Sequence, residues 1–136
     1  MTNALERQVG GGHYKSMGMQ PIEFAMTNQW DAAAFSVLKY LSRHRNKNGV
    51  EDLKKARHFI ELRVELGRLR FAAIERVPMS RYISLNNISG LDAAALMWLE
   101  SWVVEPTEER DLGDVMRCID LMIAEYGGDS QLSLLR

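Results

Sequence analysis

The sequence predicts an all-α protein, a small helical bundle built from two degenerate copies of a three-helix unit. Apolar residues recur at helical spacing, as Ala34, Val37, Leu38 and Leu41 do at i, i+3, i+4 and i+7. No alternating pattern typical of a strand exceeds four residues. The duplication is indicated by the segment DAAAF at residues 31–35, which recurs as DAAAL at residues 92–96.

The repeat extends further along the chain, but the charges are not repeated. The pair DL at 52–53 recurs at 111–112, and IEL at 60–62 recurs as IDL at 119–121. The offset changes from 61 to 59 residues between blocks, which places a two-residue gap in a loop. The basic positions Lys39, Arg43 and Lys55 align with Glu100, Val104 and Asp114. A shared fold requires only the apolar pattern, so the unshared charges mark where function is expected.

An irregular, glycine-rich segment is expected over residues 1–20, and the first helical unit over 21–76. Pro21 suits the first turn of a helix, where its missing N–H costs nothing. Asp31 suits the N-cap of the next helix because its carboxylate can accept from free N–H groups. The spacing predicts helices over 21–28, 32–45 and about 50–74, with a turn at 46–49. The inward positions of the third helix are Leu53, Ala56, Ile60, Val64 and either Leu66 or Gly67.

The second helical unit is expected over residues 79–127, after Pro78. A short helix is predicted over 82–87, followed by a loop to residue 90, with Asp92 as the N-cap of the next helix. The helical pattern is interrupted at 105–107. The last helix is then expected to run to about 126, where two glycines end it. Residues 128–136 are expected to form a tail.

Composition favours an ordinary globular protein, with 26% charged and 46% hydrophobic residues. No apolar run approaches the roughly 20 residues that span a bilayer, and the polar start of the chain does not resemble a secretory signal. The lone cysteine, Cys118, is expected in the core and favours a reducing, cytoplasmic location. His13, His44 and His58 lack metal-binding spacing, so no transition-metal site is predicted.

The net charge of −1 conceals an asymmetry between the units. Residues 39–58 carry seven Lys or Arg against two acids, whereas residues 98–117 carry two against six. One interpretation is that the basic unit binds an anionic ligand. The other is that the two units attract each other, within one chain or between chains. Small cores favour a homo-oligomer.

The basic residues follow a helical logic. Lys39 and Arg43 are four apart and share a face, and Asp52 and Lys55 are three apart on the next helix. If these helices pair antiparallel, Arg43, Asp52 and Lys55 gather at one end together with Lys47 of the turn. A helix N-terminus near residue 50 would add free N–H groups, an arrangement suited to phosphate. The alternative is a solvated charged face.

A second anion-binding element is suggested by the segment GGGHYKS at residues 10–16. Glycines let backbone N–H groups turn toward an anion, and Lys15 adds a charge. The segment is not a P-loop, because Tyr14 precedes Lys15 and no strand precedes the glycines. The alternative is a flexible linker followed by an anchoring tyrosine.

Four blocks in order resemble the SaV-like family of small bacteriophage proteins, relatives of the T7-type phage nucleotide kinase. They are GGHYK at 11–15, PIEF at 21–24, KYLSR at 39–43 and KNGVEDLKKA at 47–56. The resemblance covers roughly residues 10–65. It implies a phage-encoded cytoplasmic protein that binds deoxynucleoside monophosphates and transfers a phosphoryl group from a nucleoside triphosphate without a P-loop.

The first hypothesis is therefore a nucleotide-binding enzyme, since phosphoryl transfer requires positioning and positive charge more than covalent chemistry. The expected catalytic residues are Arg43, Asp52 and Lys55, and Asp52 with Glu51 would hold Mg²⁺ or orient the acceptor. A base would stack on Tyr14 or Tyr40. The expected ligand-binding residues are His13, Tyr14, Lys15, Lys39, Tyr40, Arg43, Lys47 and Lys55.

The rival hypothesis is a non-enzymatic phage protein that binds and inhibits a host or defence protein, or sequesters a nucleotide. The acidic surface over 98–114 would then be the interface. Nucleic-acid binding through 39–58 is a third, weaker hypothesis, and the net charge of −1 argues against it. No membrane partner is expected.

Overall fold

The computed structural model describes residues 4–66, 75–104 and 109–127, and in these ranges it is helical and contains no strand. The prediction of an all-α fold is confirmed. Short 3-10 helices at Ala4–Glu6, Tyr14–Ser16 and His44–Asn46 accompany the α-helices. These are α1 (Pro21–Thr27), α2 (Ala32–Arg43), α3 (Val50–Leu66), α4 (Met79–Leu85), α5 (Gly90–Val104) and α6 (Glu109–Gly127).

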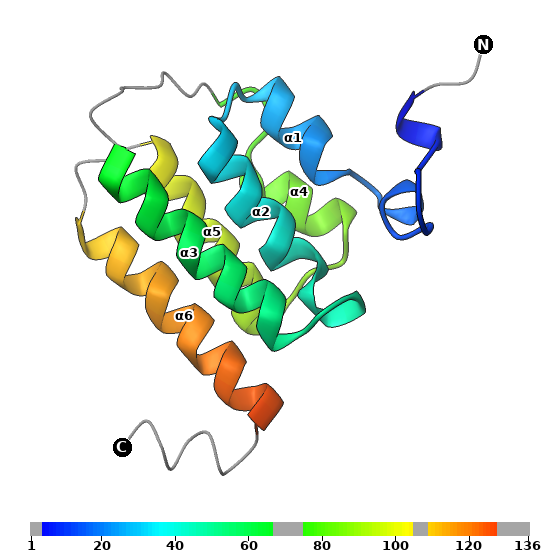
Figure 1. The fold of residues 1–136 in the computed structure, drawn as a ribbon. Helices are drawn as coiled ribbons and strands as arrows, with labels where there is room; N and C mark the ends of the chain where they lie inside the picture. Colours follow the sequence, from blue (N-terminus) through cyan, green and yellow to red (C-terminus); the bar gives the residue numbers. More distant parts are fainter. Residues whose placement is uncertain (1–3, 67–74, 105–108, 128–136) are drawn as a thin grey trace.

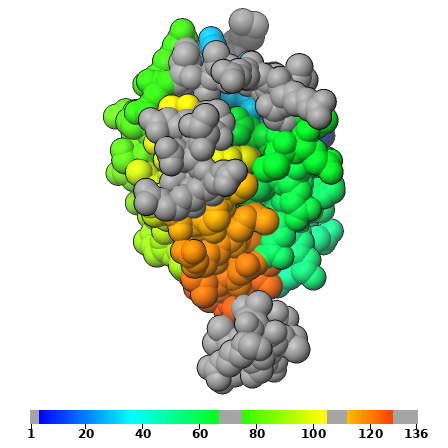
Figure 2. Space-filling model, turned by 90° about the vertical axis from the view of Figure 1, so that its left-hand side faces the viewer, coloured from blue at the N-terminus to red at the C-terminus, as the bar shows by residue number. Residues whose placement is uncertain are grey.

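Two helical hairpins, α2–α3 and α5–α6, form the body of the molecule (Figure 1). They pack with α2 against α5 and α3 against α6, and the short helices α1 and α4 lie on α2 and α5. Figure 2 shows the outer side of α6 in orange, with α3 in green beside it. None of the described helices is long and apolar enough to cross a membrane.

The core contains the predicted apolar positions of α2, and the expected inward residues Leu53, Ala56 and Ile60 of α3. Cys118 is buried as expected. Val64 and Leu66 are 55% and 61% exposed, so their predicted inward position is wrong. The inward position at this end of α3 belongs to Arg63, which lies over the Trp102 ring at 4.6 Å and pairs with Asp31 at 2.8 Å.

Helix starts were predicted with mixed success. Asp31 caps α2 as expected, its carboxylate accepting from the Ala34 N–H at 2.8 Å. Asp92 is not the cap of α5, because the helix begins two residues earlier at Gly90 and the Asp92 carboxylate binds Arg45. Helix α4 begins at Met79, three residues before its predicted start, and α2 ends in a 3-10 turn. The predicted extension of α3 over 67–74, the break at 105–107 and the tail over 128–136 lie outside the described residues.

The two units repeat one local geometry around an asparagine. Asn28 ends α1 and Asn86 ends α4, and each is followed by a residue in the left-handed region, Gln29 (φ 55°) and Asn87 (φ 54°). The Asn28 side chain donates to the Val77 carbonyl at 2.8 Å and accepts from the Val77 N–H at 2.9 Å. A common origin of the two units, as the sequence repeat suggests, stays a prediction.

Asn86 makes the reciprocal contact in the other unit. Its amide donates to the Met19 carbonyl at 2.9 Å and accepts from the Met19 N–H at 3.0 Å. Met19 precedes α1 by two residues, just as Val77 precedes α4. Each unit therefore holds the segment that leads into the first helix of the other, and the N-terminal segment is tied to the body next to the start of α1.

Candidate functional site

The N-terminal loop is closed on itself by a side chain that the sequence analysis overlooked. Gly10 and Gly11 take positive φ values of 73° and 80°, which turn the chain back. The Gln8 side-chain oxygen then accepts from the N–H groups of Tyr14 (2.6 Å) and Lys15 (3.3 Å). These two N–H groups are therefore bound to the uncharged Gln8 amide. The contacts of the loop with the rest of the protein are made by its side chains and not by these backbone groups.

Arg43, the last residue of α2, links this loop to the hairpin. Its guanidinium donates to the Tyr14 hydroxyl at 3.3 Å. It also donates to both carboxylate oxygens of Asp52, at 3.2 and 3.1 Å. Asp52 is fully buried and accepts in addition from the Asn48 N–H at 3.3 Å. The antiparallel pairing that the sequence predicted thus joins the end of α2 to the start of α3.

Three cations surround the ring of Tyr40. Lys39 Nζ lies 4.7 Å, the Arg43 guanidinium carbon 4.8 Å and Lys55 Nζ 5.5 Å from its centroid. The ring also stacks on Phe59, with centroids 5.9 Å apart. An aromatic face attracts cations, which offsets part of their mutual repulsion. We call Lys39, Tyr40, Arg43, Lys47 and Lys55 the cationic face.

Among the described residues, the cations of this face are only partly matched by acids. Arg43 pairs with Asp52, and Lys55 pairs with Glu51 at 3.5 Å. Lys39 and Lys47 have no carboxylate within ion-pair distance in the part of the chain that the structure describes. This end of the α2–α3 hairpin therefore carries positive charge that no described carboxylate neutralises.

His13 stands next to the cationic face. Burial, with added effects from the positive charges of Lys47 and Arg43, lowers its pKa below the usual value. Its ring lies against Tyr14, with centroids 5.2 Å apart. Its Nε2 atom is buried and has no hydrogen-bond partner among the described residues. Lys15, by contrast, is exposed and contacts none of the other predicted ligand-binding side chains in any described interaction.

The donor set does not fit a magnesium ion held by the protein. Both oxygens of Asp52 already accept from Arg43. Glu51 is exposed and paired with Lys55. No group of three His, Cys, Asp or Glu residues suited to a metal occurs in the described ranges. The magnesium cofactor stays a prediction, and in the structure the two residues predicted to hold it, Asp52 and Glu51, are engaged with Arg43 and Lys55.

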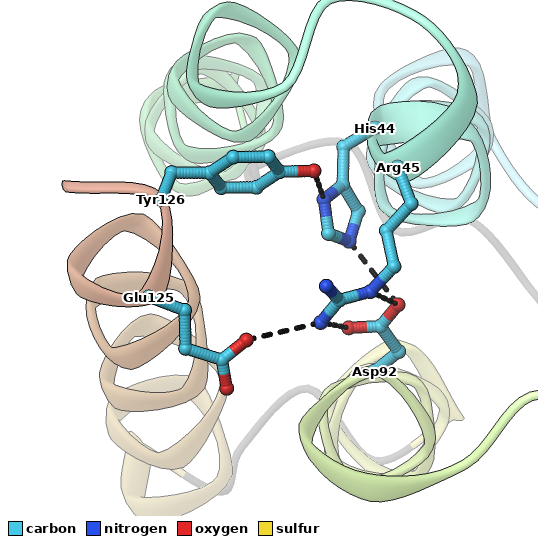
Figure 3. A network of polar contacts seen from close by, with 5 residues as sticks. All are labelled: His44, Arg45, Asp92, Glu125 and Tyr126. Atoms are coloured by element: carbon cyan, nitrogen blue, oxygen red, sulfur yellow. Dashed lines mark hydrogen bonds and ion pairs between the residues drawn. The ribbon is translucent and has the colours of Figure 1, made fainter. Parts of the chain in front are cut away.

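Other basic residues of the first unit face the second unit instead (Figure 3). Arg45 donates to both oxygens of Asp92, at 2.7 and 2.9 Å, and to Glu125 at 3.2 Å. The buried His44 ring lies between the Tyr126 hydroxyl at 2.8 Å and Asp92 at 3.2 Å. Although burial of Asp92 opposes it, the hydrogen bonds from His44 and Arg45 hold the pKa of this carboxyl below its usual value.

A further ion pair joins Arg57 of α3 to Asp120 of α6. The interpretation that the two units attract each other within one chain therefore holds for Arg45 and Arg57. It does not account for Lys39 or Lys47, which contact no acid of the second unit in the described structure. The basic residues of the first unit divide into a set that binds the second unit and a set that forms the cationic face.

The structure brings most of the predicted site residues together, and it adds some that sequence reasoning missed. His13, Tyr14 and Asp52 adjoin the cationic face, whereas Lys15 has no described side-chain contact with it. Phe59 lies four residues after Lys55, a helical spacing that could have pointed to it. No pattern in the sequence pointed to Gln8, because its contacts depend on how the N-terminal loop folds back.

A family model described as a protein of unknown function (DUF3310) matches residues 10–61. The match begins at the glycines of the N-terminal loop and ends within α3, so it contains the whole cationic face and none of the second unit. It covers nearly the same residues as the resemblance to the SaV-like family. Comparison with curated proteins and with solved structures finds no match.

Proposed function

We propose that this protein binds nucleotides through their phosphates at the cationic face. The observation that carries the proposal is the gathering of three cations around Tyr40, with Lys39 and Lys47 lacking a described carboxylate partner. Like charges held close together repel each other, and a bound polyanion relieves that repulsion. The resemblance to a phage nucleotide kinase supports the same ligand class.

The roles follow from the geometry. Within the described ranges Lys39 and Lys47 lack a carboxylate partner, and Lys55 reaches the same Tyr40 ring as Lys39. Arg43 is partly exposed, with its guanidinium oriented by Asp52 and Tyr14, so it can contact a phosphate without first being ordered. The Tyr40 ring is engaged by cations and by Phe59 and serves to hold them, which leaves the base to be bound elsewhere.

Phosphoryl transfer is the activity that the resemblance supports for this site. The γ-phosphoryl group of a nucleoside triphosphate would pass to a deoxynucleoside monophosphate, leaving two diphosphates. The chain's own contribution would be to hold both sets of phosphates against the cationic face and to lower their repulsion. The protein would then act in the cytoplasm of a phage-infected cell.

The test is thermal unfolding with a panel of nucleoside mono- and triphosphates, with and without Mg²⁺. A ligand at 100 times its dissociation constant stabilises the folded state by about 2.7 kcal/mol, which raises Tm by several degrees. Lys39→Gln/Lys47→Gln should remove most of this shift. These residues are preferred to Arg43, because removing Arg43 would also leave the buried Asp52 without its ion-pair partner.

The matched control is Lys54→Gln, which changes an exposed lysine of α3 that lies outside the cationic face. It should keep the full shift. If no nucleotide stabilises the wild-type protein, the proposed function is wrong. If a shift occurs, formation of nucleoside diphosphates from the two substrates decides between transfer and binding alone.

A second candidate function, binding to a host or defence protein, is favoured by exposed apolar side chains on α5. Met97, Trp98 and Val104 are 44%, 37% and 37% exposed. Large aromatic and methionine side chains are enriched at protein interfaces. Trp98→Ser should then abolish capture of a host protein and leave nucleotide stabilisation unchanged. The same surface would serve a homo-oligomer, which sedimentation of the pure protein would reveal.

A further inference from the structure

A cavity of about 450 Å³ has His13 in its wall, and His13 is close enough to Lys47 and Arg43 of the cationic face for their charges to act on it. Its wall is formed by three segments that are far apart in the sequence: the N-terminal loop, the end of α2 with the following turn, and the loop between α4 and α5. Cavities that bind small molecules commonly have volumes of roughly 300–1,000 Å³. Both helical units contribute to this one.

The side chains that line the cavity can form hydrogen bonds, and their charges cancel. Asn46, Asn87 and Ser89 present amide and hydroxyl groups, and Met17 and Ile88 add apolar surface. The charged groups on the wall, Arg45 and Asp92, are bound to each other through two hydrogen bonds. Amide and hydroxyl groups both donate and accept, so the cavity suits a neutral, polar molecule with an apolar face.

One residue of the cavity wall has a polar atom without a partner. His13 lines the cavity, and its Nε2 atom is buried and has no hydrogen-bond partner among the described residues. A buried polar atom without a hydrogen bond is costly, so a ligand that reached Nε2 through a turn of the ring would relieve that cost. A neutral imidazole can accept or donate at this position, depending on its tautomer.

Two residues of the cavity wall are neighbours of the cationic face. Ser42 lines the cavity, and Arg43, the next residue of α2, belongs to the cationic face. His13 lines the cavity and is close enough to Lys47 and Arg43 for their charges to act on it. A molecule with a neutral part in the cavity would extend its charged part toward these cations.

We propose that the cavity binds the nucleoside part of a nucleotide, its sugar and base, whose phosphates contact Arg43 and Lys47. This inference rests on the proposed function and adds the place where base and sugar are recognised. The sugar hydroxyl and the edge of the base would bond Asn46, Asn87 or Ser89. His13 would bond the ligand through Nε2, and the flat face of the base would lie against Met17 and Ile88.

The test compares a nucleotide with an anion that has no nucleoside. Isothermal titration calorimetry measures the affinity of the deoxynucleoside monophosphates and of tripolyphosphate for wild type, Ser89→Leu and His13→Phe. Ser89→Leu fills the cavity with an apolar side chain, and His13→Phe removes the bond from Nε2. Each should weaken the preferred monophosphate by about tenfold, the loss expected for a hydrogen-bonded contact. Tripolyphosphate affinity should stay within about twofold.

Ser80→Leu is the matched control, because Ser80 is exposed on α4 and does not line the cavity. It should bind both ligands as the wild type does. Far-UV circular dichroism and Tm establish that the variants fold. Because the two cavity variants change different groups, one of them stays informative if the other misfolds.

Two other outcomes are distinguishable. If the wild type binds the monophosphate and both cavity variants bind it equally well, the nucleoside lies elsewhere, and this inference is wrong while the proposed function stands. If the wild type binds neither the monophosphate nor tripolyphosphate, the proposed function itself fails and this inference fails with it.

Discussion

Arg43 and Asp52 combine a structural and a binding role in one ion pair. Asp52 is fully buried, and besides Arg43 only the Asn48 N–H donates to it among the described contacts. Removing one partner of a buried ion pair commonly costs about 3–5 kcal/mol, because the other charge stays buried. The loss of about 1.5–3 kcal/mol expected for one phosphate contact is therefore smaller than the effect of Arg43→Ala on folding.

The titration of His13 provides a test at the level of a single residue. Burial and the charges of Lys47 and Arg43 lower its pKa in the folded protein. A phosphate bound to these cations offsets their charge, so we expect the pKa of His13 to rise and a proton to be taken up on binding. Calorimetry near pH 6.5 in buffers of different ionisation enthalpy measures this uptake, and His13→Gln should abolish it. Binding without proton uptake would contradict the placement of the phosphates.

The same group affects stability without ligand. Because the folded state lowers the pKa of His13 below its ordinary value of 6.5, the unfolded chain binds the proton more readily. The contribution of His13 to stability is thus complete above pH 6.5 and is lost as the pH falls from there through the folded-state pKa. Denaturant unfolding of His13→Gln should lack this loss.

At the scale of elements, each of the two asparagines that end α1 and α4 holds the segment that leads into the first helix of the other unit. The Asn86 side chain donates to and accepts from the backbone of Met19, and the Asn28 side chain does the same with Val77 and also accepts from the Arg76 N–H. An amide side chain can satisfy a backbone carbonyl and a backbone N–H at once, because it both donates and accepts. These contacts connect segments that helix packing alone would leave free.

Replacing either asparagine should destabilise the protein, but only one replacement should affect the ligand. Asn28→Ala and Asn86→Ala each leave backbone groups without partners, which costs about 1–3 kcal/mol in urea unfolding. Asn86→Ala also releases the end of the N-terminal loop, so we expect it to weaken nucleotide binding more than Asn28→Ala does. Asn48→Ala, at an exposed side chain, is the control. Equal binding by the two variants would mean that the loop does not contribute to the site.

At the scale of the whole molecule, the opposite charges of the two units meet across their interface. Arg45 binds Asp92 and Glu125, and Arg57 binds Asp120. Arg57 and Asp120 are 32% and 46% exposed, so water and salt screen their attraction. These pairs orient the hairpins relative to each other, while the buried apolar core supplies most of the free energy of folding.

A charge exchange tests this role. Arg57→Asp should lower stability by about 0.5–1 kcal/mol, the range of a partly exposed ion pair, and Asp120→Arg should do the same. The double variant restores the opposite charges and should recover most of the loss, which urea unfolding at low and high salt can measure. Additive losses in the double variant would show that the two side chains are not coupled.

The sequence predicted the helices and most of the cationic face because both depend on local spacing. The stripe of α2, the cap at Asp31 and the grouping of Lys39 with Arg43 follow from the helical repeat. Predictions at helix ends were less successful, as Asp92 shows. Its cap position was plausible locally, but Arg45, 47 residues away, provides its partner.

By itself, the sequence determined that the chain is helical, which helix faces are buried and that positive charge collects in the first unit. Only the tertiary structure decided how that charge is used. Arg45 and Lys47 are two residues apart, yet one binds the second unit and the other is left beside His13. The cavity likewise requires three segments to meet. Helical periodicity is set by neighbours in the chain, whereas ion pairs and cavities are set by residues that only folding brings together.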